Sequence, residues 1–174
     1  MMNLQGKKVA IFLETYYEDP EFWYPYYRLI EAGTEVVVIA PEVGEYKSKV
    51  GYPAISDLAA RDAQAEQFDA VIVPGGFSPD YMRRSVDMVN LLKKSYSLGK
   101  IIAAICHGPW MLISIDALKE RKATSYFSIK DDMVNAGAIF IDQPVVRDGN
   151  VITSRSPSDL PSFCREILNA LETE

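Results

Sequence analysis

Hydrophobic positions along the chain fall into two patterns that alternate from the N-terminus to the C-terminus. Short continuous runs rich in β-branched residues are typical of strands that are buried on both faces of a sheet. Longer stretches, in which apolar residues recur at helical spacing, are typical of amphipathic helices. The alternation of the two predicts a mostly parallel sheet with helices packed on both faces.

Strands are predicted at residues 7–13, 34–41, 68–76 and 100–106, with short strands near "AIFID", "PVVRDG" and "NVITSR". Helices are predicted at residues 18–33, 78–100, 107–118, 128–136 and 158–171. Residues 44–60 lack helical spacing and are predicted to form a hairpin or an excursion from the sheet, followed by a short helical piece that begins near Arg61 or Asp62. No linker, repeat or low-complexity segment interrupts this order, so a single domain is expected over residues 1–174.

The helix predicted at residues 18–33 has recognisable start and stop signals. Asp19 suits the N-cap, Pro20 the first helical position and Gly33 the residue after the last turn. Pro25 falls inside the same helix, where a missing N–H predicts a local distortion.

The composition limits the kinds of molecule that the protein is expected to bind. The chain has 18 Lys and Arg against 24 Asp and Glu, with a formal net charge of -6. Because the two signs are mixed along the sequence, neither a nucleic-acid surface nor an anionic membrane surface is expected. The apolar run from Val9 to Leu13 is too short for a signal-peptide core or a membrane span, so a cytoplasmic location is expected.

The two cysteines and one histidine make a poor metal inventory. Cys106 and Cys164 lie far apart, and the chain has no CxxC spacing, so neither a disulfide nor a metal site is expected. The single histidine, His107, instead follows Cys106 directly in "IIAAICHGPW", at the end of a predicted strand.

Three features fall at the carboxyl ends of predicted strands, where ligands bind in open parallel sheets. They are Glu18, the pair Gly75 and Gly76, and the pair Cys106 and His107. A cysteine at a sharp turn from strand to helix is exposed above the sheet and faces the positive end of the helix, which favours the thiolate. Backbone N–H groups of the glycine pair are suited to holding an oxyanion, and Glu18 is suited to a hydrogen bond with the sulfur.

Each feature also has a plainer interpretation. Cys106 alone fits a small buried apolar residue, and Cys164, in the amphipathic stretch "LPSFCREIL", is expected to be structural. The glycine pair alone fits an ordinary turn, and Glu18 alone fits an acid in the first turn of a helix. The combination at one edge of the sheet favours the catalytic interpretation.

Long segments over the whole chain carry a further indication: "YYEDPEFWYPYYRLIEAGTEV", "FDAVIVPGGFSPDYMR", "AAICHGPWMLIS", "RKATSYFSIKDDMVNAGA" and "VVRDGNVITSRSPSDLP". On these segments the chain resembles the ThiJ/PfpI superfamily, specifically the PfpI branch of intracellular proteases. The resemblance implies a flavodoxin-like three-layer α/β/α sandwich of the class I glutamine amidotransferase type. It also implies a Cys106 nucleophile, Glu18 hydrogen-bonded near the sulfur, and an oxyanion site from the N–H groups of Gly76 and His107.

In the branch that the chain resembles, the histidine after the cysteine is its base, oriented by an acid from a neighbouring subunit of a hexameric ring. The matching acid position is Asp80, where the PfpI pattern has a glutamate that is one methylene longer. The resemblance therefore implies a homo-oligomer (dimer, trimer or hexamer) with Asp80 acting across an interface. Tyr126 matches a tyrosine that lines the family's site.

The first functional hypothesis is therefore a PfpI-like cysteine-dependent hydrolase acting on peptides or small carbonyl compounds, without a cofactor. A second is a cofactor-independent glyoxalase or protein deglycase acting on methylglyoxal-type substrates, because a thiolate also adds to aldehydes. A third, outside enzymology, is a redox-stress sensor or chaperone that acts through oxidation of Cys106. Flavin binding gains little support, since "ETYYEDPEF" lacks the glycine- and hydroxyl-rich loop that a phosphate requires.

Overall fold

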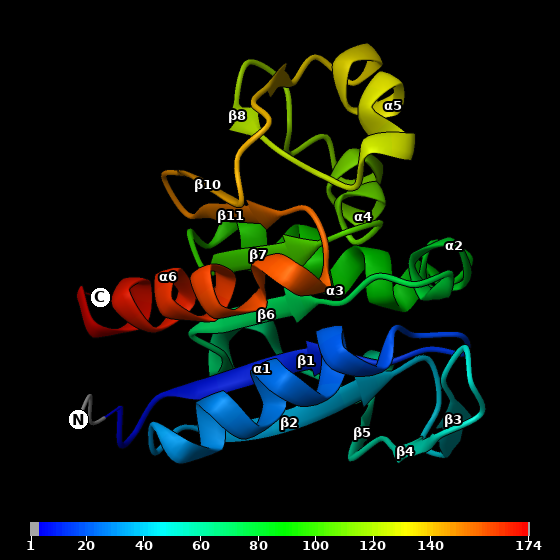
Figure 1. Ribbon diagram of the computed structural model, residues 1–174. Helices are drawn as coiled ribbons and strands as arrows, with labels where there is room; N and C mark the ends of the chain where they lie inside the picture. The colour runs from blue at the N-terminus through cyan, green and yellow to red at the C-terminus, as the bar shows by residue number, and fades with distance from the viewer. Residues whose placement is uncertain (1–3, 174) are drawn as a thin grey trace.

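The computed structural model describes residues 4–173 and has a seven-stranded central sheet (Figure 1). The strand order is β10-β11-β7-β6-β1-β2-β5, and every neighbouring pair is parallel except β10 with β11. This mostly parallel order confirms the predicted fold class, a flavodoxin-like α/β sandwich. The strands are β1 (Lys8–Phe12), β2 (Glu35–Ala40), β5 (Leu58–Ala59), β6 (Ala70–Val73), β7 (Ile101–Ile105), β10 (Val145–Asp148) and β11 (Val151–Ser154).

Helices cover both faces of this sheet. The helices of the described residues are α1 (Asp19–Glu31), α2 (Ser78–Met82), α3 (Val86–Ser97), α4 (Pro109–Ser114), α5 (Lys130–Asn135) and α6 (Leu160–Thr173), of which α5 lies beyond the central sheet (Figure 1). Short 3₁₀ turns occur at Ala60–Asp62, Ala65–Gln67, Phe127–Ile129 and Pro157–Asp159. Two small sheets lie outside the central one: the antiparallel hairpin β3 (Glu45–Lys47) with β4 (Pro53–Ile55), and the parallel pair β8 (Lys122–Ala123) with β9 (Ile139–Phe140).

The central strands bury both of their faces, which produces two hydrophobic cores. In β1, Val9 and Ile11 pack in the core that includes α1 and α6 residues, whereas Ala10 and Phe12 pack in the core that includes α3 residues. Alternate side chains of a strand point to opposite faces, so the continuous apolar run seen in the sequence supplies both cores at once. In Figure 1, α1 and α6 lie side by side over one face of the sheet.

Several predicted boundaries were wrong for local reasons. The helix predicted at residues 78–100 is two helices, because Ser85 leaves the helical conformation and its side chain caps α3 by accepting a bond from Met88 N. The helix predicted at residues 107–118 is only the six residues of α4. The N-cap of α1 is Glu18 and not Asp19, and the short strands β5 and β8 were not anticipated.

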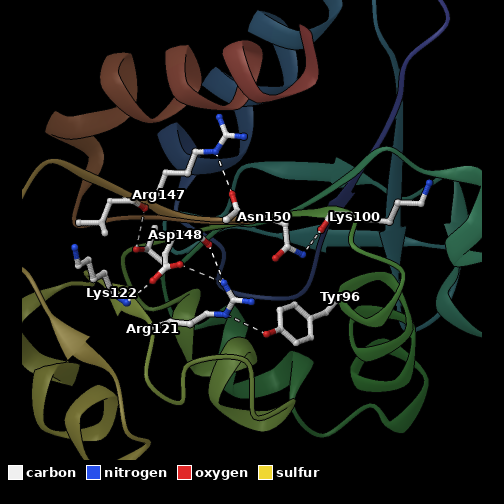
Figure 2. A network of polar contacts seen from close by, with 10 residues as sticks. Tyr96, Lys100, Arg121, Lys122, Arg147, Asp148 and Asn150 are labelled. Carbon is white, nitrogen blue, oxygen red and sulfur yellow. Dashed lines mark hydrogen bonds and ion pairs between the residues drawn. The ribbon is translucent and has the colours of Figure 1, made fainter. Parts of the chain in front are cut away.

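A polar network anchors the segment that follows α4 (Figure 2). Arg121 Nε donates to the Tyr96 hydroxyl of α3 at 3.1 Å, and its Nη1 donates to the Asp148 carbonyl at 3.0 Å. The carboxylate of Asp148 accepts a bond from Lys122 N at 2.8 Å. These bonds hold the segment that includes β8 and α5, which extends beyond the central sheet (Figure 1); Tyr126 lies between these two elements.

No helix within residues 4–173 combines the length and the apolar character that crossing a bilayer requires.

Candidate active site

Cys106 occupies a tight turn directly after β7. Its φ of 62° lies in the left-handed region, which residues other than glycine seldom adopt. The surrounding backbone holds it there, because Cys106 N donates to Ser154 O at 3.0 Å and Cys106 O accepts from Tyr126 N at 3.0 Å. Backbone strain of this kind persists where neighbouring structure overrides it, and it is concentrated at functional sites.

Two glycines make room for this turn. A Cβ on Gly75 would lie 2.6 Å from Glu21 Oε2 and 2.8 Å from Cys106 Cβ. A Cβ on Gly108 would lie 2.5 Å from Val73 O, a backbone atom that cannot rotate away. Both positions therefore require glycine for space, even though neither needs a positive φ.

Gly76 brings a backbone donor to the sulfur. It has a φ of 73°, pairs with Tyr17 in an isolated antiparallel bridge, and has no room for a Cβ, which would lie 2.4 Å from Tyr16 O. The N–H groups of Gly76 and His107 both interact with the Cys106 sulfur and lower its pKa. A role for the two N–H groups in holding an oxyanion stays a prediction that this convergence supports.

His107 lies between the thiol and a serine. Its Nδ1 is 3.2 Å from Cys106 Sγ, and its Nε2 is 3.2 Å from Ser128 Oγ. The imidazole ring packs against Tyr126 and Trp110, each with a centroid separation of 5.2 Å. Burial, and secondarily the positive charge of Lys49, lower the pKa of His107, so the imidazole is neutral at neutral pH.

The carboxyl group beside the sulfur is Glu21, and the expectation that Glu18 lies there was wrong. Glu21 is 0% exposed, accepts a bond from Gly75 N at 2.8 Å through Oε2, and interacts with the Cys106 thiol. Its other oxygen, Oε1, has no hydrogen-bond partner among the described residues. Burial raises the pKa of Glu21 to about 7, against the opposing effect of the bond from Gly75.

Glu18 occupies a different environment. It is the N-cap residue of α1, and its Oε2 forms an ion pair with Lys49 Nζ at 2.7 Å. Glu18 and Glu21 are one helical turn apart, but only Glu21 lies on the face of α1 that packs against the sheet, together with Phe22, Pro25 and Leu29.

The resting site favours a thiol, contrary to the expected thiolate. Burial raises the pKa of Cys106 most strongly, and the negative charge of Glu21 raises it further, so the opposing N–H groups do not prevail. Cys106 therefore needs a base to release its proton. Protonation of Glu21 removes the repulsion between its carboxylate and a thiolate at Cys106.

Asp80 and Tyr126, the other two predicted site residues, have different neighbours. Asp80 lies in α2, where it forms an ion pair with Arg84, and it borders a cavity of about 570 Å³. Tyr126 packs its ring against His107. The cavity is lined by Tyr16, Lys49, Phe77, Asp80, Tyr81 and Trp110. A contribution of Asp80 to a neighbouring subunit stays a prediction.

Sequence reasoning missed Glu21, Ser128 and Lys49. Glu21 had a usable signal, because it precedes Pro25 by four residues and Leu29 by eight and so falls on the apolar face of the predicted helix. Ser128 and Lys49 had none, because they reach the site through a 3₁₀ turn and a hairpin loop.

The fold and this geometry define a class: an α/β sandwich with a cysteine in a strained turn at the carboxyl end of an inner strand of its sheet, β7. The chain belongs to the DJ-1/PfpI family, which it matches over residues 7–170. It is 42% identical over 165 residues to Deglycase PfpI of Pyrococcus furiosus, covering 95% of this chain and 99% of that protein.

Two further comparisons agree with the family. A Bacillus subtilis protein provisionally named a cysteine protease, YraA, is 42% identical over 168 residues, covering 96% of this chain and 99% of that protein. The crystal structure of Drosophila melanogaster DJ-1beta superposes with a TM-score of 0.90 at 30% identity, covering 97% of this chain and 91% of that one.

Proposed function

We propose that this protein is a Cys106-dependent deglycase, which releases hydroxy acids from the adducts that α-oxoaldehydes form with amines and thiols. The observation that carries the proposal is the buried Glu21 carboxyl beside the thiol, with a pKa raised to about 7 and one unpartnered oxygen. A carboxyl group with this pKa both accepts and donates a proton at neutral pH. The 42% identity to a protein named a deglycase supports the same function.

In the first step, Cys106 forms a hemithioacetal with the substrate. The thiol proton passes to His107 Nδ1, 3.2 Å away, while sulfur bonds to the terminal carbon of the α-oxoaldehyde. A free aldehyde becomes an alkoxide, which the Gly76 and His107 N–H groups stabilise before it is protonated. In an amine adduct the same carbon already bears a hydroxyl group, and the amine leaves with the proton that His107 returns.

In the second step, Glu21 moves a proton between adjacent carbons. As the carboxylate it removes the proton from the carbon that bears sulfur, which gives an enediolate. It then returns this proton to the neighbouring carbon, while the hydroxyl proton passes from the oxygen of the first carbon to the oxygen of the second. The product is a thioester of a hydroxy acid, and water hydrolyses it to regenerate the thiol. One carbon is oxidised as its neighbour is reduced, so methylglyoxal plus water gives lactate without an external oxidant or reductant.

The peptidase hypothesis needs one more group than this chemistry does. It depends on Asp80 of a neighbouring subunit orienting His107, and in its own chain Asp80 is paired with Arg84. The proton transfers of the deglycase reaction are assigned to Glu21 and His107 of one chain, which favours the deglycase over the peptidase.

The proposal is tested by measuring the release of lactate and of the free amine from methylglyoxal-modified N-acetylarginine. The same preparation is assayed for lactate formation from free methylglyoxal and for cleavage of a fluorogenic peptide. Cys106→Ala is expected to lower the rate of lactate formation by about 10³-fold or more, because the nucleophile is lost, while Cys164→Ala stays within about twofold of the parent.

The rate from the adduct must exceed the rate at which the adduct spontaneously releases methylglyoxal; otherwise the protein is a glyoxalase. Peptide cleavage without lactate would support the peptidase hypothesis instead. Dioxygenation of Cys106 at low peroxide, measured by intact mass, with no turnover of any substrate, would support the sensor.

A further inference from the structure

The outer nitrogen of His107 has a partner that none of the functional hypotheses uses. His107 Nε2 lies 3.2 Å from Ser128 Oγ, on the side of the imidazole opposite Cys106. Given that His107 is the base of the proposed reaction, we propose that Ser128 is a positioning residue that holds the imidazole with Nδ1 free to accept the Cys106 proton. Ser128 thus makes, within one chain, the contact to the histidine that the acid makes in a Cys-His-acid arrangement.

The backbone fixes Ser128 relative to the cysteine turn. Ser128 is the middle residue of the 3₁₀ turn Phe127–Ile129, which begins directly after Tyr126. Tyr126 N donates to Cys106 O at 3.0 Å, and Ile129 N donates to Tyr126 O at 3.1 Å. Ile129 is buried and anchors the end of the turn in the core. The serine hydroxyl is therefore presented to His107 by the same bonds that hold the cysteine turn.

The two contacts of the imidazole select one tautomer. If Nδ1 is to accept a proton from the thiol, the hydrogen of the neutral ring must reside on Nε2. Ser128 Oγ is then the acceptor for Nε2–H, and its own hydrogen is free to point to solvent, because Ser128 is exposed. The proposal commits to the Nε2–H tautomer in the resting protein.

The charges around His107 suit a neutral base. Cys106 lies beside it at the turn after β7, the positive charge of Lys49 reaches it from the β3–β4 loop, and Tyr126 packs against the ring. A carboxylate at the position of Ser128 would stabilise the imidazolium strongly, whereas an uncharged hydroxyl orients the ring with little preference for the charged form. His107 thus remains neutral until it takes the thiol proton.

The single histidine makes a direct test feasible. Tag-free protein labelled with ¹⁵N-histidine gives one pair of imidazole signals, whose shifts report the tautomer and the pKa. The parent is expected to be mainly the Nε2–H tautomer. Ser128→Ala is expected to shift the ring toward a mixture and to slow Cys106 alkylation by iodoacetamide about two- to tenfold, the loss typical of one hydrogen bond. Ser128→Thr, which keeps the hydroxyl, is expected to restore both.

The outcomes separate this proposal from the proposed function. An Nδ1–H tautomer in the parent, or identical tautomer and alkylation in Ser128→Ala, would overturn the role of Ser128 even if lactate is formed. A tautomer shift in Ser128→Ala in protein that turns over no carbonyl substrate would leave Ser128 in place and reject the deglycase. Far-UV circular dichroism of each variant checks folding, which an exposed serine is not expected to affect.

Discussion

Both cysteines of this protein are buried, yet only Cys106 lies at the candidate site. Cys106 is 7% exposed at the end of β7, and Cys164 is 4% exposed inside α6. Burial raises the pKa of both thiols, that of Cys164 to about 12. Exposure and resting pKa therefore do not tell the two apart.

The backbone conformation and the neighbouring polar groups distinguish Cys106 from Cys164. Cys106 has a positive φ, two N–H groups directed at its sulfur, and an imidazole 3.2 Å away. Cys164 has helical backbone and lies in a hydrophobic core with residues such as Phe163 and Leu168. A buried thiol becomes a candidate nucleophile through donors and a base that are already aimed at it, because these stabilise the charge that develops on reaction.

Thiol labelling gives the largest expected contrast between the two cysteines. In native protein, iodoacetamide is expected to modify Cys106 about 10³-fold faster than Cys164, because Cys164 must wait for local opening of the helix. Peptide mapping by mass spectrometry during a time course measures both rates in one sample.

Denaturant sharpens this labelling experiment. Urea well below the unfolding midpoint should accelerate labelling of Cys164 and leave Cys106 nearly unchanged, and the two rates should converge in fully unfolded protein. Equal rates in the native state would remove the distinction between the sites. Cys164→Ala is the matched control, since the labelling rate of Cys106 is not expected to change in it.

Gly75 is the position at which the Cys106 site is most easily broken without touching its reactive groups. In Gly75→Ala, the new methyl group must displace Glu21 or Cys106, so turnover of the adduct is expected to fall about 10²-fold and stability by about 1–3 kcal/mol. Gly44→Ala is the control, because a Cβ there meets nothing within 4 Å. Steady-state lactate formation and urea unfolding measure the two effects. Retention of full activity in Gly75→Ala would show that the distance between Glu21 and the sulfur does not matter.

The sequence allowed prediction of the sheet and of the cysteine turn because both depend on local pattern. Apolar runs such as "AVIV" and "IIAAI" have no polar face and must be covered on both sides, which determines the layered architecture. Cys106 followed by Gly108 and Pro109 marks a tight turn into a helix, whatever the rest of the chain does.

The remaining site residues could not be predicted in the same way. Glu18 and Glu21 lie one turn apart, and the N-cap position does not distinguish them; only the helical spacing of Glu21 to Pro25 and Leu29 indicates that Glu21 is the buried carboxyl. Ser128 reaches His107 only because the Arg121 network and the bond from Tyr126 N to Cys106 O fold a distant segment over the turn. Contacts of this kind depend on tertiary packing and leave no periodic trace in the sequence.

Glu21 and Glu18 extend the comparison to a smaller effect, the dependence of stability on pH. The pKa of Glu21 is raised to about 7 in the folded protein, above its ordinary value of 4.5, so the folded state binds the proton more tightly than the unfolded state. The stability that the protonated Glu21 carboxyl contributes to the fold is fully present below pH 4.5. It is lost as the pH rises from there through 7, because an ionised carboxylate must then stay buried. Burial without a partner for Oε1 is the physical reason.

Glu21→Gln removes this titration and keeps an oxygen for the Gly75 N–H. Relative to the parent, the variant is expected to be more stable by less than about 1 kcal/mol at pH 5 and by about 3 kcal/mol at pH 8. Urea unfolding at both pH values measures the difference, and Glu18→Gln, at a partly exposed ion pair, is expected to change by less than about 1 kcal/mol at either. If the gain in Glu21→Gln does not depend on pH, Glu21 is ionised throughout and the proton transfer assigned to it needs another carrier. If the gain appears between pH 5 and 8, the Glu21 carboxyl that destabilises the fold also exchanges a proton beside Cys106 near neutral pH. Loss of stability in return for activity is common at active sites.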